Sequence, residues 1–271
     1  MLAPLLCTGS ADAWDSATHR AIARLAVEAL PPSPLKTFLA RNDAALETHS
    51  VEPDTVLKEK YGEAEKRRHY LDIEQFGSDP WSGLDPDLRK MQRRFGIRTI
   101  EHAGTLPWTI DGVSRELEIA WHRGDCAAVL RLSGYLAHYV GDASQPLHST
   151  KYYDGDPGDR GIHRRIEVAV DDSVRELAPM AMREVRIEEI NAVWTPAIAE
   201  IRNANGLIGE LTRDDRAARG AGYDERDYRR ALMHEDAAMF ARQIARAASV
   251  LASIWRFEWH RAGSPAACAG P

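Results

Sequence analysis

The sequence predicts an all-α protein folded as a single multi-helix domain. Three observations support this class. Apolar residues recur at helical spacing, as at Ile22, Leu25, Ala26 and Leu30. Proline and glycine separate these segments at intervals typical of helix connections. No stretch carries the alternation and paired turn signals of strands and hairpins. A length of 271 residues with 44% hydrophobic residues is enough for a sizeable core.

The N-terminal half is predicted to contain four helices and a long irregular stretch. Asp15 or Ser16 can cap the first helix, and Pro31-Pro32 ends it. Residues 47–69 are polar and irregular, and 70–87 contain the glycines and prolines of a loop. The predicted helices here are 15–30, 34–46, 86–102 and 107–122, the last with Pro107 in its first turn.

The C-terminal half alternates predicted helices with one acidic loop. A helix begins at Asp125 and is expected to end just after Asp142, because Gly141 lies beside this residue and Pro146 follows it. Residues 151–160 are rich in Asp and Gly and are predicted to form a loop. A helix opens at His163, residues 175–216 are helical with interruptions at Pro179 and Pro196, and a last helix covers 227–260.

The net charge of −6 argues against a module that binds duplex nucleic acid. Lys and Arg are mixed with Asp and Glu, and the sequence contains no basic tract. This argues less strongly against an enzyme that acts on phosphates, because bound metal ions would supply positive charge locally. No apolar run approaches the roughly 20 residues that cross a bilayer.

Residues 1–13 have the character of a signal-peptide remnant, which leaves 14–271 as the folded domain. Met1 to Leu6 is apolar, and Ala11-Asp12-Ala13 is a small-x-small triplet of the kind that precedes cleavage. The segment is short and lacks a basic start, so an ordinary chain terminus is the alternative. We expect export, to the periplasm or outside the cell. Cleavage after Ala13 would expose Trp14.

The sequence contains three cysteines, and none of them is a candidate catalytic residue. Cys7 would leave with the signal segment. Cys126 and Cys268 have neither the pairing nor the spacing of a zinc ribbon, and they are expected either to form one disulfide or to stay free.

The segment from His138 to His148 contains three side chains that can bind metals. His138 and Asp142 are four residues apart and share a helix face, and the bend at Pro146 can return His148 to the same point. His163 and Glu167 repeat the i, i+4 spacing. One such pair is commonly a surface hydrogen bond, but two pairs with His148 within about 30 residues favour a site of the kind that suits zinc.

Three further residues become candidate ligands once the helices are placed, namely His19, Asp54 and His69. Each has a simpler interpretation, as a helix-face histidine, a turn residue after Pro53 and a loop histidine. A di-iron carboxylate bundle is excluded, because the set is rich in histidine and lacks paired Glu-x-x-His motifs.

Together these positions resemble the zinc-dependent phospholipase C and single-strand-specific nuclease superfamily. The motifs are Trp14-x4-His19, Asp54, His69-Tyr-x-Asp, His138-x3-Asp142-x5-His148 and His163-x3-Glu167. The resemblance covers residues 14 to about 170 and implies three zinc ions. It assigns Asp54, His69, His138 and Asp142 to one zinc, His148, His163 and Glu167 to a second, and His19, Asp142 and the backbone amine and carbonyl of Trp14 to a third.

The resemblance also implies hydrolysis of a phosphodiester. Clustered zinc ions neutralise the phosphoryl oxygens and lower the pKa of bound water toward ~7. Asp142 is the natural bridging carboxylate. We hypothesise that Asp54 both ligates zinc and orients or deprotonates the attacking water. Lys58 is a candidate to steady the phosphate, and Arg67 or Arg68 are alternatives to it.

The two branches of the superfamily imply different substrates. Trp14-x4-His19 has the short spacing of the nuclease branch, in which Tyr70 and Asp72 would stack on and hydrogen-bond a base. Residues 161–167, with Glu167 as last ligand, resemble the phospholipase branch. The Gly-Gly-Asn and Asn-Leu-His segments typical of the nucleases are absent.

We therefore expect a zinc-dependent phospholipase C-type hydrolase. The alternatives are a single-strand-specific nuclease or 3′-nucleotidase with the same mechanism, and an exported zinc-binding protein without activity. The expected partners are the phosphodiester substrate and, transiently, a membrane surface, and no obligate protein partner is implied. Trp81, Trp108 and Trp121 are candidates for a lipid-facing rim, although burial in the core is expected for two of the three.

Overall fold

The computed structural model describes residues 16–156, 159–220, 224–266 and 268, and these residues form helices, turns and irregular segments without any strand. The all-α prediction is therefore confirmed. The helices are α1 (Ser16–Ala29), α2 (Pro34–Arg41), α3 (Asp43–His49), α4 (Lys58–Tyr61), α5 (Glu63–Lys66), α6 (Leu88–Phe95), α7 (Ile97–Ala103), α8 (Leu106–Arg123), α9 (Cys126–Ser144), α10 (Ile162–Met182), α11 (Trp194–Asn205), α12 (Ile208–Gly220) and α13 (Glu225–Arg261).

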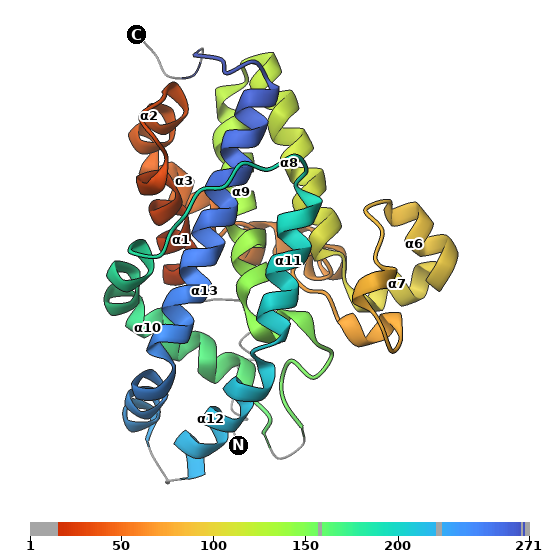
Figure 1. The fold of residues 1–271 in the computed structure, drawn as a ribbon, viewed down its shortest axis with the longest axis vertical. Helices are drawn as coiled ribbons and strands as arrows, with labels where there is room; N and C mark the ends of the chain where they lie inside the picture. The colour runs from red at the N-terminus through yellow and green to blue at the C-terminus, as the bar shows by residue number, and fades with distance from the viewer. Residues whose placement is uncertain (1–15, 157–158, 221–223, 267, 269–271) are drawn as a thin grey trace, which may run out of the picture.

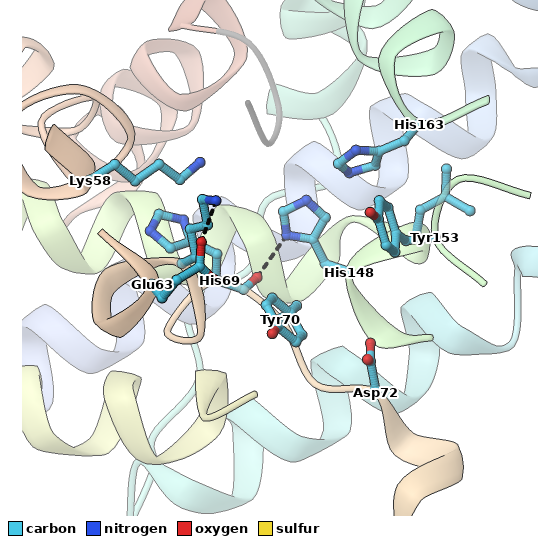
Figure 2. A pocket seen from close by; sticks show the side chains of 10 residues that line it. Lys58, Glu63, His69, Tyr70, Asp72, His148, Tyr153 and His163 are labelled. Atoms are coloured by element: carbon cyan, nitrogen blue, oxygen red, sulfur yellow. Dashed lines mark hydrogen bonds and ion pairs between the residues drawn. The ribbon is translucent and has the colours of Figure 1, made fainter. Parts of the chain in front are cut away.

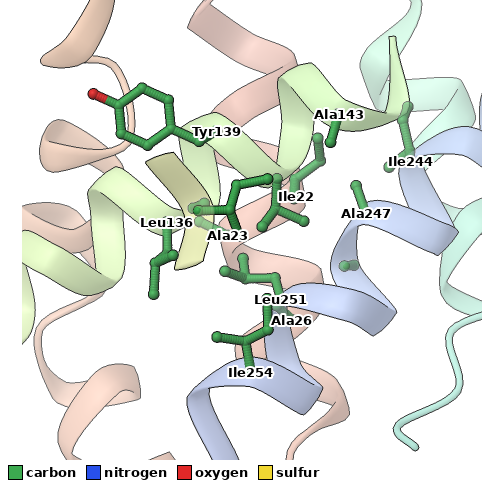
Figure 3. Packing of buried hydrophobic residues seen from close by; sticks show 14 of the residues in the cluster. Ile22, Ala23, Ala26, Leu136, Tyr139, Ala143, Ile244, Ala247, Leu251 and Ile254 are labelled. Atoms are coloured by element: carbon green, nitrogen blue, oxygen red, sulfur yellow. The ribbon is translucent and has the colours of Figure 1, made fainter. Parts of the chain in front are cut away.

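The core of the molecule forms where α1, α9 and α13 meet. Small and branched side chains from the three helices interlock there, and Figure 3 shows Ala23 and Ala26 of α1 facing Leu251 of α13. Alanines at these positions let the helix axes approach closely. In Figure 1, α13 runs along the long axis of the view beside α9, and α6 with α7 protrudes from the bundle. The core thus holds α1 and α9 in a fixed mutual position.

The first correction concerns residues 34–69. The predicted helix 34–46 is two helices, because the backbone of Asn42 leaves helical geometry and its side-chain amide caps the carbonyl of Phe38 at 2.8 Å. The stretch 47–69 was predicted to be irregular, and that was wrong. It contains the end of α3, one π-helical turn η1 (Pro53–Leu57), α4 and α5, which are separated at Gly62 with its positive φ of 56°. Short helical turns of this length leave no clear periodicity in a sequence.

The second correction concerns the next two segments. Within 70–87 there are two short 3₁₀ turns, η2 (Ile73–Phe76) and η3 (Trp81–Gly83). The predicted helix 86–102 is broken by Gly96, whose φ of 90° is incompatible with a right-handed helix. The helix 107–122 is confirmed as α8, with Pro107 in its first turn as expected.

The third correction concerns the prolines of the C-terminal half. Pro179 does not interrupt α10, because it lies near the exposed end of the helix, where water can reach the carbonyl that loses its partner. Pro196 occupies the first turn of α11 instead of breaking a helix. Residues 183–193, which were predicted to be helical, carry no helix. The last helix is confirmed as α13.

A disulfide joins Cys126 at the start of α9 to Cys268, and it selects one of the two states left open by the sequence. Trp108 and Trp121 are buried while Trp81 is half-buried, so two of the three tryptophans lie in the core as expected. Among the described helices, none combines the length and apolarity that crossing a bilayer requires.

Candidate metal centre

Eight of the nine predicted ligands converge on one buried site, and the ninth, Trp14, lies outside the described residues. The eight are His19 of α1, Asp54 of η1, His69, His138 and Asp142 of α9, His148, and His163 and Glu167 of α10. Asp142 is fully buried and lies within 3.6 Å of four of the histidines. The sequence therefore identified residues that the fold does bring together.

Helix α9 supplies the centre of the site. His138 and Asp142 share one face, with 3.4 Å between Nε2 and Oδ2. His19 reaches the other carboxylate oxygen of Asp142 from α1, at 3.6 Å from Nε2 to Oδ1. Gly141 makes this approach possible, because a Cβ atom there would lie 2.8 Å from the His19 ring. A glycine inside a helix is costly, and here the close contact of α1 with α9 requires it.

Asp54 of η1 and His69, which follows α5, supply the second side. Nδ1 of His69 lies 3.0 Å from Oδ2 of Asp142 and 3.4 Å from Oδ1 of Asp54. The same nitrogen is 3.0 Å from Nε2 of His138. Two imidazoles and two carboxylates thus point their donor atoms at one small volume.

The third side forms where the chain turns after α9. The helix ends at Ser144, two residues beyond Asp142, and Pro146 opens the 3₁₀ turn η4 (Pro146–Ser149). This turn returns His148 to 3.6 Å from Asp142, as predicted. His163 and His148 place ring nitrogens 2.9 Å and 3.6 Å from one oxygen of Glu167. Gln145 donates a 3.0 Å hydrogen bond to that oxygen and fixes the carboxylate.

Groups outside the cluster set the orientation of three rings. The Nδ1 atom of His138 donates to the carbonyl of Ser50 at 2.9 Å, which leaves Nε2 facing Asp142. The Nδ1 atom of His148 donates to the carbonyl of His69 at 2.7 Å. Glu65, buried in α5, lies 3.3 Å from Nε2 of His69. A partner that binds one ring nitrogen leaves the other nitrogen free and orients it toward the cluster. Glu65 was not among the residues predicted from the sequence, although its i, i+4 spacing to His69 was a usable signal.

Burial keeps the imidazoles of His19 and His69 neutral. It lowers the pKa of His69 to about 3, with His138 adding to the effect, and the pKa of His19 falls well below its usual value for the same two reasons. Burial raises the pKa of Asp142 well above its usual value, and the carboxylate of Asp54 adds to this. Burial would also raise the pKa of Asp54, but His138 and His69 hold it well below its usual range. Neutral imidazoles keep the lone pairs that bind metals.

The donor set fits zinc. Both ring nitrogens of His19 and both oxygens of Asp142 are buried without a hydrogen-bond partner among the described residues. Unsatisfied buried polar atoms are costly unless an ion occupies the space between them. Three groups place their donor atoms within 4.8 Å of one another, namely His19–His138–Asp142, Asp54–His69–His138 and His148–His163–Glu167. Imidazole and carboxylate donors in threes are typical of zinc sites.

A pocket of about 430 Å³ opens above the cluster. Figure 2 shows His69, His148 and His163 at its floor, with Lys58 on one wall and Tyr153 on the other. Tyr70 and Asp72 also line it, and burial together with Glu74 raises the pKa of Asp72 to about 7. Tyr153 was not predicted from the sequence, because it lies in an acidic loop without periodicity.

Of the three predicted phosphate-binding cations, Lys58 alone lines this pocket. Its ammonium lies 2.5 Å from Oδ1 of Asp54. Arg67 pairs with Glu101, and Arg68 pairs with Glu65. Arg68 also lies over the ring of Tyr139. Both arginines are thus directed to other partners.

Two solved structures with a similar fold are alpha-toxins. The chain resembles the alpha-toxin of an avian strain of Clostridium perfringens with a TM-score of 0.55 and 17% identity over 93% of this chain. It resembles the alpha toxin of Clostridium absonum with a TM-score of 0.53 and 14% identity over 91% of this chain. This chain spans only 66% and 64% of those proteins. No curated protein sequence matches significantly.

A family model decides the relationship more directly than these distant structures do. It describes zinc dependent phospholipase C and matches residues 18–204. The matched part runs from α1 through α11, and it includes all eight of the clustered side chains. The chain is therefore a member of the zinc-dependent phospholipase C family.

Proposed function

We propose that this protein is a phospholipase C-type hydrolase that cleaves a phospholipid into diacylglycerol and a phosphorylated head group. The observation that carries the proposal is the convergence of three ligand groups around Asp142, directly below the pocket. Family membership supports the same reaction class. A buried structural site would not need an open pocket over its ligands.

Three zinc ions would be held by the set that the sequence predicts. Asp54, His69, His138 and Asp142 would bind the first ion, and His148, His163 and Glu167 would bind the second. His19 and Asp142 would complete the third with the backbone of Trp14, which lies outside the described residues. Zinc supplies Lewis-acid stabilisation of the phosphoryl oxygens and lowers the pKa of water toward ~7.

The protein's own groups then have distinct tasks. Asp54 accepts the proton of the attacking water, since its neighbours keep the carboxylate ionised at neutral pH. Lys58 lies at the pocket wall, where its ammonium can contact an anionic phosphoryl oxygen. The buried imidazoles and Asp142 hold the centre in place. Together the walls orient the phosphodiester above the cluster.

A single-strand-specific nuclease or 3′-nucleotidase is the second candidate, and one observation favours it. Tyr70 and Asp72 both line the pocket, where they could stack on and hydrogen-bond a base. The family match and the Glu167 ligand favour the phospholipid. A zinc-binding protein without activity is the third possibility. It fits less well, because all eight described ligands are present beneath an open pocket.

A paired assay tests the proposal. Protein that begins at Trp14 is offered dispersed phosphatidylcholine and single-stranded DNA, each with and without a chelator. We expect phosphocholine release that the chelator abolishes. Nucleotide release would assign the nuclease activity instead, and zinc content without either product would support the inactive protein. Protein that begins at Trp14 is expected to bind three zinc ions per chain. Protein that keeps residues 1–13 is expected to bind fewer.

A further inference from the structure

Exposed tyrosine and valine side chains occur in the two segments that line opposite walls of the pocket. Seven large hydrophobic residues are exposed in the described part of the chain, and four of them are Val56, Tyr61, Tyr152 and Tyr153. They come from two segments on opposite walls of the pocket. Val56 and Tyr61 flank Lys58, and Tyr153 lines the pocket itself (Figure 2). Four of the seven exposed apolar side chains thus belong to the two segments that supply Lys58 and Tyr153 to the pocket walls.

Each wall carries the same pair of neighbouring side chains. The ammonium of Lys60 lies 4.9 Å from the ring centre of Tyr61, and that of Lys151 lies 4.9 Å from the ring of Tyr152. Both tyrosines are at least half exposed. Tyrosine prefers the interface between water and hydrocarbon, because its ring is apolar and its hydroxyl is polar. Lysine can bury its chain there and reach the phosphates with its ammonium.

We propose that this rim, formed by Tyr61 and Tyr152 with Lys60 and Lys151, docks the protein on the surface of a phosphatidylcholine bilayer. The inference rests on the proposed function, since the phosphodiester of a phospholipid lies at the bilayer surface. A pocket that receives it has to be brought to that surface. The buried Trp108 and Trp121 cannot make this contact, so the tyrosines replace the tryptophan rim considered from sequence.

The charges of the protein favour a zwitterionic lipid surface over an anionic one. Residues 58–66 contain three lysines and three glutamates, and the whole chain carries a net charge of −6. Glu63 is paired with Lys66 at 2.6 Å beside the pocket. Such a balanced segment gives no strong attraction to anionic lipid. We therefore expect binding to depend on the aromatic side chains and to vary little with salt.

The test compares Tyr61→Ser/Tyr152→Ser with a matched control, Ile119→Ser/Met180→Ser. The control residues are also exposed apolar side chains, but they lie on α8 and α10 and do not line the pocket. Zinc-loaded full chains are sedimented with phosphatidylcholine vesicles. The tyrosine variant should bind on the order of tenfold more weakly, and the control should bind like the parent. Tyr61→Trp/Tyr152→Trp should restore binding.

Activity measurements distinguish an effect on membrane docking from an effect on catalysis. Turnover of vesicle lipid should fall in parallel with binding, whereas turnover of a dispersed short-chain phosphatidylcholine should not change. The proposal would be overturned if the tyrosine variant and the Ile119→Ser/Met180→Ser control lost vesicle binding equally. It would also be overturned if the tyrosine variant bound vesicles like the parent. Weaker binding of single-stranded DNA with unchanged vesicle binding would assign the rim to nucleic acid. If the parent hydrolyses no phospholipid at all, the proposed function fails, while the binding measurement still tests the rim.

Discussion

Asp54 differs from the other acidic side chains of the cluster because it contacts both the imidazoles and Lys58. If it accepts the proton of the attacking water, Asp54→Asn should lower kcat by about 10²–10⁴-fold. Some zinc should be retained, since the amide oxygen is still a donor. Steady-state kinetics and zinc analysis on the same sample check this. Glu59→Gln, an exposed change nearby, is the control. A kcat within a few-fold of the parent would remove Asp54 from proton transfer.

Glu65 is predicted to act on the metal through His69. It is buried, and its oxygens contact the His69 ring, the Tyr139 hydroxyl and Arg68. Glu65→Gln should weaken zinc binding by about 10–100-fold, because a neutral amide orients and polarises the imidazole less well. Competition with a zinc chelator measures the change, with Glu63→Gln at the exposed neighbouring position as control. Unchanged affinity with an unchanged melting temperature would show that Glu65 has no such role.

The pattern of single residues predicted the clustered side chains better than it predicted the groups that orient them. His138–Asp142 and His163–Glu167 are visible because a helix fixes i, i+4 neighbours on one face. The carbonyl of Ser50, which orients His138, carries no residue-specific signal. Tyr153 reaches the pocket only through tertiary packing of an irregular loop. A sequence specifies which side chains are present. Which backbone groups contact them, and where loops lie, depends on the fold.

At the scale of helices, long elements were predictable and short ones were not. The 37-residue α13 and the apolar α9 have many turns over which a stripe of side chains can recur. The four-residue α4 and α5 have one turn each. Pro179 shows a different limit, because whether a proline ends a helix depends on how exposed the affected carbonyl is. That exposure is a property of the folded molecule.

The contact between α11 and α13 predicts a pH dependence of stability. Glu200 is buried on α11 and pairs with Arg246 of α13 at 2.9 Å. Burial raises the pKa of Glu200 to about 7, despite the opposing effect of Arg246. The folded state therefore binds the proton more tightly than the unfolded state does. The resulting contribution to the stability of the folded state is full below about pH 4.5 and is lost as pH rises through about 7.

Glu200→Gln should remove this dependence. The melting temperature of the parent minus that of the variant should decrease by several degrees between pH 5 and pH 8. The candidate zinc ligands are identical in both proteins, so their titration cancels in the difference. Calorimetry at four pH values is sufficient. A difference that stays constant or grows with pH would mean that Glu200 is ionised throughout and stabilised by Arg246.

For the whole molecule, the cluster lies at the junction of α1, α9, α10 and the segment from η1 to His69, so metal binding should stabilise the fold. Without an ion, buried carboxylates and imidazoles face one another with unsatisfied atoms. Zinc at about 1,000 times its Kd would add about 4 kcal/mol to the free energy of unfolding. For a domain of this size, that corresponds to roughly 10 °C in Tm. Chelation should lower Tm by this order.

Two further measurements locate the effect. Added Zn²⁺ should restore Tm, whereas Ca²⁺ should not, because imidazole donors suit zinc and not a hard oxygen-seeking cation. Hydrogen exchange should accelerate on chelation around His19, His138 and His163, while α6 and α7, which protrude from the bundle, should change little. A chelated protein with unchanged Tm and exchange would show that the cluster is satisfied without metal, and the zinc centre would then have to be abandoned.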